Sequence, residues 1–188
     1  MDHRSTIHQQ FTQQAIVFSN APSMTDPEAI RLLVAASGAT ANDRCLDVAC
    51  GPGLVALALA QTAREVVGLD TTQAMLDRAW ELQQQRKITN VSWTLGEADA
   101  LPFPDASFDV VTCRYAFHHM LAPARALQDM QRVTRPGGRA VVCDAVASDD
   151  GAKAQAFNTF ERMRDPSTVR FLTRTALRDT FETCGLAI

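Results

Sequence analysis

The feature that most constrains the fold of this chain is a buried strand that runs through a turn of small residues into an apolar helix. Leu46–Val48 is typical of a buried strand, Ala49–Gly53 of a tight turn, and Leu54–Ala60 of a helix that is apolar on all sides. Because Gly51 and Gly53 have no Cβ, a ligand can approach the backbone closely, and the first free N–H groups of the helix point into the same space. The stretch predicts a nucleotide or nucleoside pocket.

A second strand supports this interpretation, because it ends on an acidic residue. Glu65–Leu69 is followed by Asp70, at the tip of what we expect to be the neighbouring parallel strand. A carboxylate in that place can accept hydrogen bonds from both hydroxyls of a ribose. A turn of small residues can also serve only to pack a helix on a strand. The strand, the helix and Asp70 together therefore favour the nucleoside pocket.

Composition excludes several other classes of protein. The 188 residues, 46% hydrophobic and 21% charged, suit one domain with a sizeable core. The sequence lacks eighteen consecutive apolar residues and a signal-peptide pattern, so we expect a cytoplasmic protein without a membrane span. The five scattered cysteines predict reduced thiols and no metal site. A net charge of −3 gives no electrostatic signature for nucleic acid.

Helices and strands alternate along the rest of the chain. Asp26 and Pro27 predict the start of a helix that Gly38 ends, and Thr72 is a candidate cap for a later helix. Further strands are expected at 91–95, 108–113 and 139–144, and further helices at 72–82, 123–133, 152–164 and 175–184, with a turn at Arg135–Gly138. This alternation predicts an α/β fold with a doubly wound, mostly parallel sheet.

The order of these elements and several motifs together resemble a known family. The motifs are Leu46-Asp47-Val48-Ala49-Cys50-Gly51-Pro52-Gly53, Gly68-Leu69-Asp70, Gly96-Glu97-Ala98-Asp99-Ala100-Leu101-Pro102-Phe103, Phe108-Asp109 and Arg132-Val133-Thr134-Arg135-Pro136-Gly137-Gly138. Over roughly residues 40 to 145 the chain resembles class I S-adenosylmethionine-dependent methyltransferases, which have a Rossmann-like fold. It is most similar to the small-molecule branch that includes the ubiquinone and menaquinone C-methyltransferases.

The resemblance implies S-adenosylmethionine as cofactor and a set of residues that bind it. Asp70 would hold the ribose hydroxyls, and Thr71 would flank the adenine. Glu97 stands where the family usually has an aspartate that reaches the adenine amino group, and Ala49 replaces a glycine, which is a mild departure. The cofactor-binding residues implied are Asp47, Ala49, Gly51, Gly53, Asp70, Thr71, Glu97, Ala98, Asp99 and Arg114, with Arg114 acting through its backbone.

Methyl transfer to a small-molecule acceptor needs the attacking atom in line behind the methyl carbon, so orientation supplies most of the acceleration. A general base is required only where the acceptor loses a proton. His118 and His119 follow the fourth strand and are the candidate bases, although paired histidines there also serve packing or hydrogen bonding. Candidate apolar walls for the acceptor are Phe11, Phe18, Phe117, Met120 and Phe157, each of which equally fits the core.

Two other functions remain open at this point. Gly51–Ala56 also matches the G-x-G-x-x-A pattern of NAD(P)-dependent oxidoreductases, and Asp70 lies near the spacing of their ribose-binding acid. The loop Gly96–Phe103 and the turn Arg135–Gly138 match the methyltransferase pattern instead. A domain that holds the cofactor without turnover is the other alternative.

We expect residues 1–188 to form a single domain of three segments: an N-terminal helical lid at 1–40, a cofactor-binding core at 41–147, and C-terminal helices with the start of a strand at 148–188. The lid follows from the resemblance, and plain core packing fits its helical spacing equally well. Leu186–Ile188 is typical of the first residues of a strand, and similar proteins continue there into an antiparallel hairpin. The expected fold therefore has a truncated hairpin, or a homodimer in which a second copy completes the sheet edge.

Overall fold

A five-stranded sheet, with every neighbouring pair parallel and the order β3-β2-β1-β4-β5, organises the computed structural model, which describes residues 2–187. Its strands are β1 (Arg44–Val48), β2 (Glu65–Asp70), β3 (Val91–Leu95), β4 (Phe108–Arg114) and β5 (Thr134–Cys143). The helices are α1 (His3–Phe18), α2 (Pro22–Thr25), α3 (Pro27–Ser37), α4 (Leu54–Leu59), α5 (Gln73–Arg86), α6 (Pro123–Val133), α7 (Gly151–Arg164) and α8 (Arg174–Thr183), with a 3-10 turn η1 (Phe117–His119). The predicted doubly wound sheet is confirmed.

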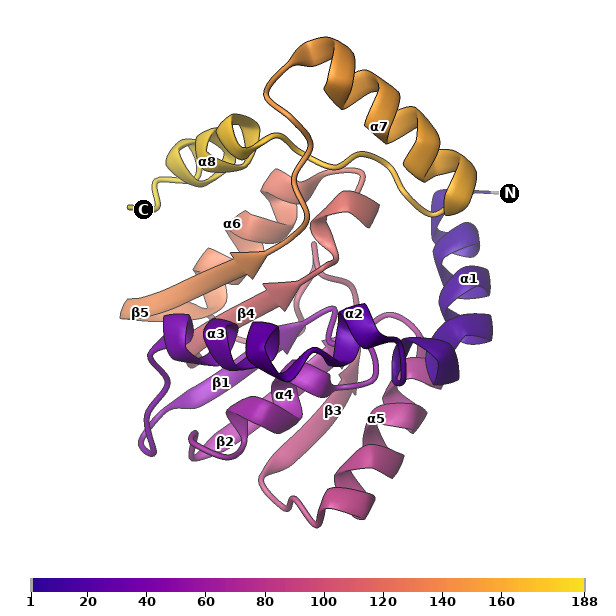
Figure 1. Ribbon diagram of the computed structural model, residues 1–188. Coiled ribbons are helices and arrows are strands. Elements are labelled where there is room, and N and C mark those ends of the chain that lie inside the picture. Colours follow the sequence, from indigo (N-terminus) through magenta and orange to yellow (C-terminus); the bar gives the residue numbers. More distant parts are fainter. Residues whose placement is uncertain (1, 188) are drawn as a thin grey trace.

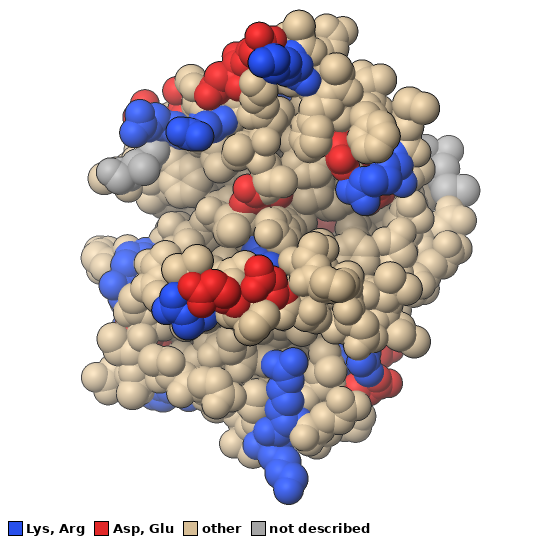
Figure 2. All heavy atoms as spheres, viewed as in Figure 1, with Lys and Arg blue, Asp and Glu red and all other residues tan. Residues whose placement is uncertain are grey.

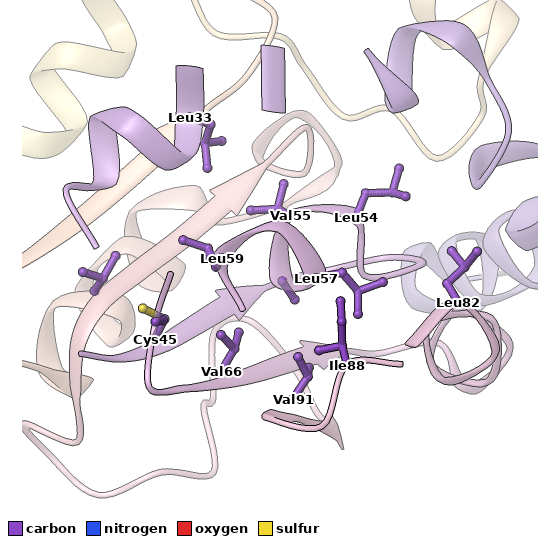
Figure 3. Packing of buried hydrophobic residues seen from close by; sticks show 13 residues of the cluster. Leu33, Cys45, Leu54, Val55, Leu57, Leu59, Val66, Leu82, Ile88 and Val91 are labelled. Atoms are coloured by element: carbon purple, nitrogen blue, oxygen red, sulfur yellow. The ribbon is translucent and has the colours of Figure 1, made fainter. Parts of the chain in front are cut away.

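One face of the sheet is covered by α3, α4 and α5. Five of the six residues of α4 are buried, as its apolar composition predicts, and they pack on strand residues such as Cys45 and Val66. Figure 3 shows Leu33 of α3 and Leu82 of α5 at the same cluster. A helix without a polar face has no stable position on the surface, so α4 lies in the middle of this layer.

The opposite face carries α6 and α8. Leu127, Met130 and Val133 of α6 are fully buried against residues of β1, β2 and β4, and Leu177 and Phe181 of α8 pack on the same cluster. Because the chain crosses to this face after β3, β1 and β4 are neighbours from the two halves of the sheet. The crevice outside their carboxyl ends is where ligands bind in open parallel sheets. Figure 1 shows α1 at the end toward which the strand arrows point.

The predicted helix ends are confirmed at α3, and α5 begins directly after Thr72 as expected, but without a side-chain cap. The Asp26 carboxylate accepts the N–H groups of Glu28 and Ala29, and α3 ends at Gly38, whose φ of 58° suits glycine. Thr72 precedes α5, but its side chain makes no capping hydrogen bond with that helix. Its backbone N–H instead donates to Asp70, which ties the start of α5 to the end of β2.

The last strand differs most from expectation. β5 begins at Thr134, so the glycines expected in a separate turn lie inside it, next to a register irregularity between Phe108 and Val110 of β4. A Cβ at Gly138 would lie 2.6 Å from the Asp109 carbonyl oxygen, so glycine is needed for this close approach. The strand expected at the chain's end is not formed at Leu186 and Ala187, and Ile188 lies outside the described residues.

The surface is mixed in charge. Figure 2 shows basic and acidic side chains close to one another over the face in view. Within residues 2–187, no helix combines the length and the apolar character needed to cross a membrane.

Candidate functional site

A cavity of about 360 Å³ opens at the carboxyl ends of the strands, within the size range of small-molecule sites. Its floor includes residues from the ends of β1 and β2 and from the turn before α4. Its walls come from α1, from the segment after β4 and from the start of α6. The sequence predicts a pocket at this turn, and the structure lines it with residues between His3 and Ala126, including the N-terminal helix α1.

The turn between β1 and α4 has three residues with left-handed backbone: Ala49 at φ 52°, Gly51 at φ 52° and Gly53 at φ 78°. Alanine tolerates this region poorly, at a cost of about 1 kcal/mol, so the replacement of a family glycine at Ala49 is less mild than its size suggests. Gly51 lines the cavity. Gly53 does not: a Cβ there would lie 2.5 Å from Trp93, so its role is close packing of α4 on the sheet.

Asp70 has the geometry expected of a ribose-binding carboxylate. Its side chain lies at the end of β2, lines the cavity and is only 7% exposed. One oxygen accepts the N–H of Gly51 at 2.8 Å and the other accepts the N–H of Thr72 at 2.9 Å. Burial raises the pKa of this carboxyl above its usual value, and the hydrogen bonds from the two N–H groups offset only part of that effect. Each oxygen keeps a second lone pair, so the carboxylate can still accept two hydroxyl groups.

Asp47 is the second buried carboxyl of the floor. It accepts the Ala56 N–H at 3.1 Å and the Thr112 hydroxyl at 2.8 Å, which joins β1 to α4 and to β4. Burial raises the pKa of Asp47 to about 7, with Thr112 and Ala56 as the opposing influences. It therefore ties α4 and β4 to β1, and it also places an acid that ionises near neutral pH in the cavity.

The predicted adenine side is connected to α1 by hydrogen bonds. The Thr71 hydroxyl donates to Glu97 at 3.0 Å and accepts from His8 of α1 at 3.0 Å. Arg4 of α1 reaches the Asp99 carboxylate at 3.9 Å. Thr71, Glu97, Ala98 and Asp99 all line the cavity.

Arg114 lines the cavity, and its side chain makes contacts that the sequence did not predict. The guanidinium donates to the carbonyl of Met24 at 2.9 Å and to that of Ser23 at 3.3 Å. It also lies 4.4 Å from the centre of the Tyr115 ring, in a cation–π contact. Arg114 therefore holds α2 at the end of β4, beside the cavity.

The two candidate bases occupy different places. His118 does not line the cavity: Nδ1 lies 2.7 Å from the Asp144 carboxylate, and the ring stacks on Phe171 at 4.1 Å. His119 lines the cavity, and its Nδ1 lies 3.1 Å from the Ser167 carbonyl oxygen. Burial, followed by the charge of His118, lowers the pKa of His119.

The structure thus brings most of the predicted residues to one cavity. The predicted site residues on its lining are Asp47, Ala49, Gly51, Asp70, Thr71, Glu97, Ala98, Asp99, Arg114 and His119, while Gly53 and His118 are not part of it. Of the proposed apolar walls, Phe11, Phe18 and Met120 line the cavity. Phe117 is buried in the core, and Phe157 lies on α7 against Phe171.

Sequence reasoning missed several lining residues, three of which lie on α1. His3, Arg4 and Ile7 precede Phe11 on this helix and face the same space. The signal for Ile7 was present, because it extends the apolar spacing of Phe11, Ala15 and Phe18 by one turn. His3 gave no such signal; its ring contacts the carbonyl oxygen of His119, 116 residues away.

Comparisons with known proteins identify the family. The family model "Methyltransferase domain" matches residues 46–142. An uncharacterized methyltransferase of Bacillus subtilis, YcgJ, is 34% identical over 160 residues, which are 85% of this chain and 63% of that protein. A demethylmenaquinone methyltransferase of Renibacterium salmoninarum is 40% identical over 114 residues, which are 61% of this chain and 46% of that protein. The chain thus spans less than two thirds of the length of these curated relatives.

Solved structures agree with the sequence matches. The crystal structure of YcgJ aligns with a TM-score of 0.82 at 34% identity and covers 85% of this chain and 68% of that one. A SAM-dependent methyltransferase of Aquifex aeolicus aligns with a TM-score of 0.67 at 20% identity, covers 89% of this chain and 87% of that one, and shows the fold alone. From its matched core, its sheet order and these relatives, the chain belongs to the methyltransferase domain family.

Proposed function

We propose that this protein binds S-adenosylmethionine in the cavity and catalyses transfer of its methyl group to a small-molecule acceptor. The observation that carries the proposal is Asp70: a buried carboxylate, oriented by Gly51 and Thr72, with one lone pair per oxygen free toward the cavity. Two free lone pairs on one carboxylate suit the adjacent hydroxyls of a ribose. The nicotinamide alternative shares this feature, and the family match favours methyl transfer.

The remaining cofactor contacts follow from the lining. The turn at Ala49–Gly51 and the Asp47 carboxyl would face the methionine portion, where an ionised Asp47 attracts a sulfonium cation. Thr71, Glu97 and the Ala98–Asp99 segment would surround the adenine. When bound, S-adenosylmethionine supplies an electrophilic methyl group. The protein's residues contribute by holding donor and acceptor in line and by excluding water.

The acceptor end of the cavity is largely apolar. Phe11, Phe18, Met24 and Met120 contribute side chains there, and α1 of the proposed lid segment 1–40 covers it. Relatives are named for demethylmenaquinone and for 2-phytyl-1,4-naphthoquinone, which are apolar ring compounds. We therefore propose a small, partly apolar ring molecule as acceptor.

A thermal-shift comparison followed by a transfer assay tests the proposal. We expect S-adenosylhomocysteine to raise the melting temperature and NADH to leave it unchanged, because ligands stabilise the state that binds them. We then expect radiolabelled methyl transfer from S-adenosylmethionine to at least one apolar ring compound in an acceptor panel. Stabilisation by NADH alone would support the oxidoreductase alternative, and cofactor binding without transfer to any acceptor would support a domain that binds without turnover.

We also propose that the protein forms a homodimer in the cytoplasm. Among the described strands, β5 pairs only with β4 and leaves one edge unpaired, and strand edges are normally paired or covered. The five free cysteines suit a reducing compartment. Light scattering tests the homodimer, and a strictly monomeric protein would contradict it. Imaging of a tagged protein in cells tests the cytoplasmic location.

A further inference from the structure

The hydrogen bonds around His119 determine which of its ring nitrogens carries the proton. The Ser167 carbonyl oxygen, 3.1 Å from Nδ1, can only accept a hydrogen bond. The Ser167 hydroxyl also lies 3.1 Å from Nδ1, and its own proton is donated to Asp165 at 2.6 Å. Both Ser167 oxygens therefore act as acceptors toward His119. Neutral His119 must then carry its proton on Nδ1 and an unprotonated lone pair on Nε2.

The ring is also held in a fixed orientation. Phe11 of α1 contacts it edge-on at 5.0 Å, and the ring of His118 lies 4.0 Å away. Ser167 is fully buried and does not line the cavity, so the Nδ1 edge of the ring faces the protein interior. The side of His119 that lines the cavity accordingly carries Nε2. Among residues 2–187, no side chain or backbone group forms a hydrogen bond with this atom.

His118 helps to fix the position of Ser167, the hydrogen-bond partner of His119. Its Nδ1 and its backbone N–H both contact the Asp144 carboxylate, at 2.7 and 3.0 Å, and Phe171 covers the ring. The carbonyl oxygen of His118 accepts the N–H groups of Val169 and Arg170, which fixes the loop that contains Ser167. Thus His118 belongs to the support of the site, and His119 presents a nitrogen to the cavity.

Burial keeps His119 neutral, because it lowers the pKa of the ring well below its usual range. The Nε2 atom is open to the cavity, so a ligand that displaces solvent there must supply a hydrogen-bond partner or leave the atom unpaired at a cost in free energy. The atom is an acceptor, so the missing partner is a donor. Phe11 and Met120, which line the cavity beside this ring, are apolar and cannot donate a hydrogen bond.

We infer that Nε2 of His119 accepts a hydrogen bond from the methyl acceptor, which must therefore carry an O–H or N–H group. This inference rests on the proposed function, because it assigns the apolar end of the cavity to the acceptor. The contact orients the acceptor behind the methyl group. It also discriminates: a site built to accept a hydrogen bond rejects an otherwise identical molecule that lacks the donor.

Nitrogen NMR of the protein with labelled histidines, saturated with S-adenosylhomocysteine, tests the inference. We expect the His119 signals to show a protonated Nδ1 and a lone pair on Nε2 at pH 7. Addition of 1-naphthol should shift the Nε2 signal, and naphthalene, which has the same rings without the hydroxyl, should leave it unchanged. A proton on Nε2, or an Nε2 signal that does not respond to 1-naphthol, would overturn the assignment.

Two variants separate this inference from the proposed function. His119→Gln places an amide oxygen near the position of Nε2, and His119→Phe keeps a planar ring without an acceptor. Both should bind S-adenosylhomocysteine within about twofold of the unchanged protein, while 1-naphthol affinity falls about tenfold or more in His119→Phe only. Equal 1-naphthol affinity in the two variants would contradict the inferred hydrogen bond from the acceptor to His119 and would leave the proposed function standing. If the unchanged protein does not bind S-adenosylhomocysteine, the proposed function itself is contradicted.

Discussion

The two ends of the cavity are built in different ways. The strand-tip end consists of Asp47, Gly51 and Asp70, whose positions follow from the register of β1 against β2 and from hydrogen bonds to backbone N–H groups. The helix end consists of residues such as Phe11, Met24 and His119, which come from separate elements and meet through a few contacts. The first end belongs to the sheet itself, and the second depends on how helices dock on the sheet.

The difference teaches where each function can change. Binding of a common cofactor needs a fixed set of donors and acceptors, and parallel strands supply fixed positions. Choice of acceptor needs variable shape, and docked helices and loops supply it without disturbing the core. Predictions that separate the two ends therefore test this division of labour.

The largest effect is expected from removal of the Asp70 carboxylate. Asp70→Ala should weaken binding of S-adenosylhomocysteine at least about 100-fold, because two hydrogen bonds to a charged group are lost at about 1.5–3 kcal/mol each. Titration calorimetry measures the affinity, with Asp77→Ala on the exposed side of α5 as the matched control. An affinity within threefold of the unchanged protein would show that the strand-tip end does not hold the ribose.

The next effect compares Gly53 of the turn with Gly137 of β5, two glycines with left-handed backbone. Gly53→Ala puts a methyl group 2.5 Å from Trp93 and 3.0 Å from the Ala79 Cβ, at φ 78°. We expect a loss of about 2–4 kcal/mol in the free energy of unfolding, from overpacking and left-handed strain together.

Gly137→Ala is the control for that substitution, since its φ of 80° is similar and no atom lies within 4 Å of the added Cβ. It should cost only the backbone strain, about 1 kcal/mol. Urea unfolding measures both variants. Equal losses would mean that Trp93 moves aside, and that Gly53 is not required for packing.

Because of Asp47, we expect the affinity for the positively charged cofactor to depend on pH. Burial raises the pKa of this carboxyl to about 7, so it is protonated at pH 6 and charged at pH 8. Affinity for S-adenosylmethionine, a sulfonium cation, should therefore rise roughly threefold to tenfold over this range. Affinity for the neutral thioether S-adenosylhomocysteine should rise less. Calorimetry at both pH values measures the difference, which Asp47→Asn should abolish; a difference that persists in that variant assigns the effect to another group.

The smallest effect is expected at the contact between α1 and Asp99. The Arg4 side chain is 65% exposed and 3.9 Å from its partner, so Arg4→Ala should change the free energy of unfolding by less than about 0.5 kcal/mol. S-adenosylhomocysteine affinity should stay within about twofold. Arg31→Ala removes a comparable exposed pair on α3 and is the control. A clear loss of affinity in Arg4→Ala alone would show that α1 contributes to the cofactor end as well.

Prediction from the sequence succeeded where structure is local. The strand–turn–helix order, the buried α4 and the acid at the end of β2 each depend on neighbours in the chain, and all three were predicted correctly. The side-chain role of Arg114 and the limits of β5 were not, because both depend on partners distant in the sequence. Arg114 is held by carbonyls 90 and 91 residues away, and the glycines of β5 fit against β4.

The sequence by itself determined the alternation of strands and helices, the parallel sheet and the strand-tip half of the site, because hydrophobic periodicity and a left-handed turn act over a few residues. Only the tertiary structure decided which histidine faces the cavity, which glycine serves packing and which helix closes the acceptor end. Two adjacent residues such as His118 and His119 have nearly the same local sequence. Their burial partners, Asp144 and Phe171 for one and Ser167 and Phe11 for the other, come from elsewhere in the chain and give them different roles.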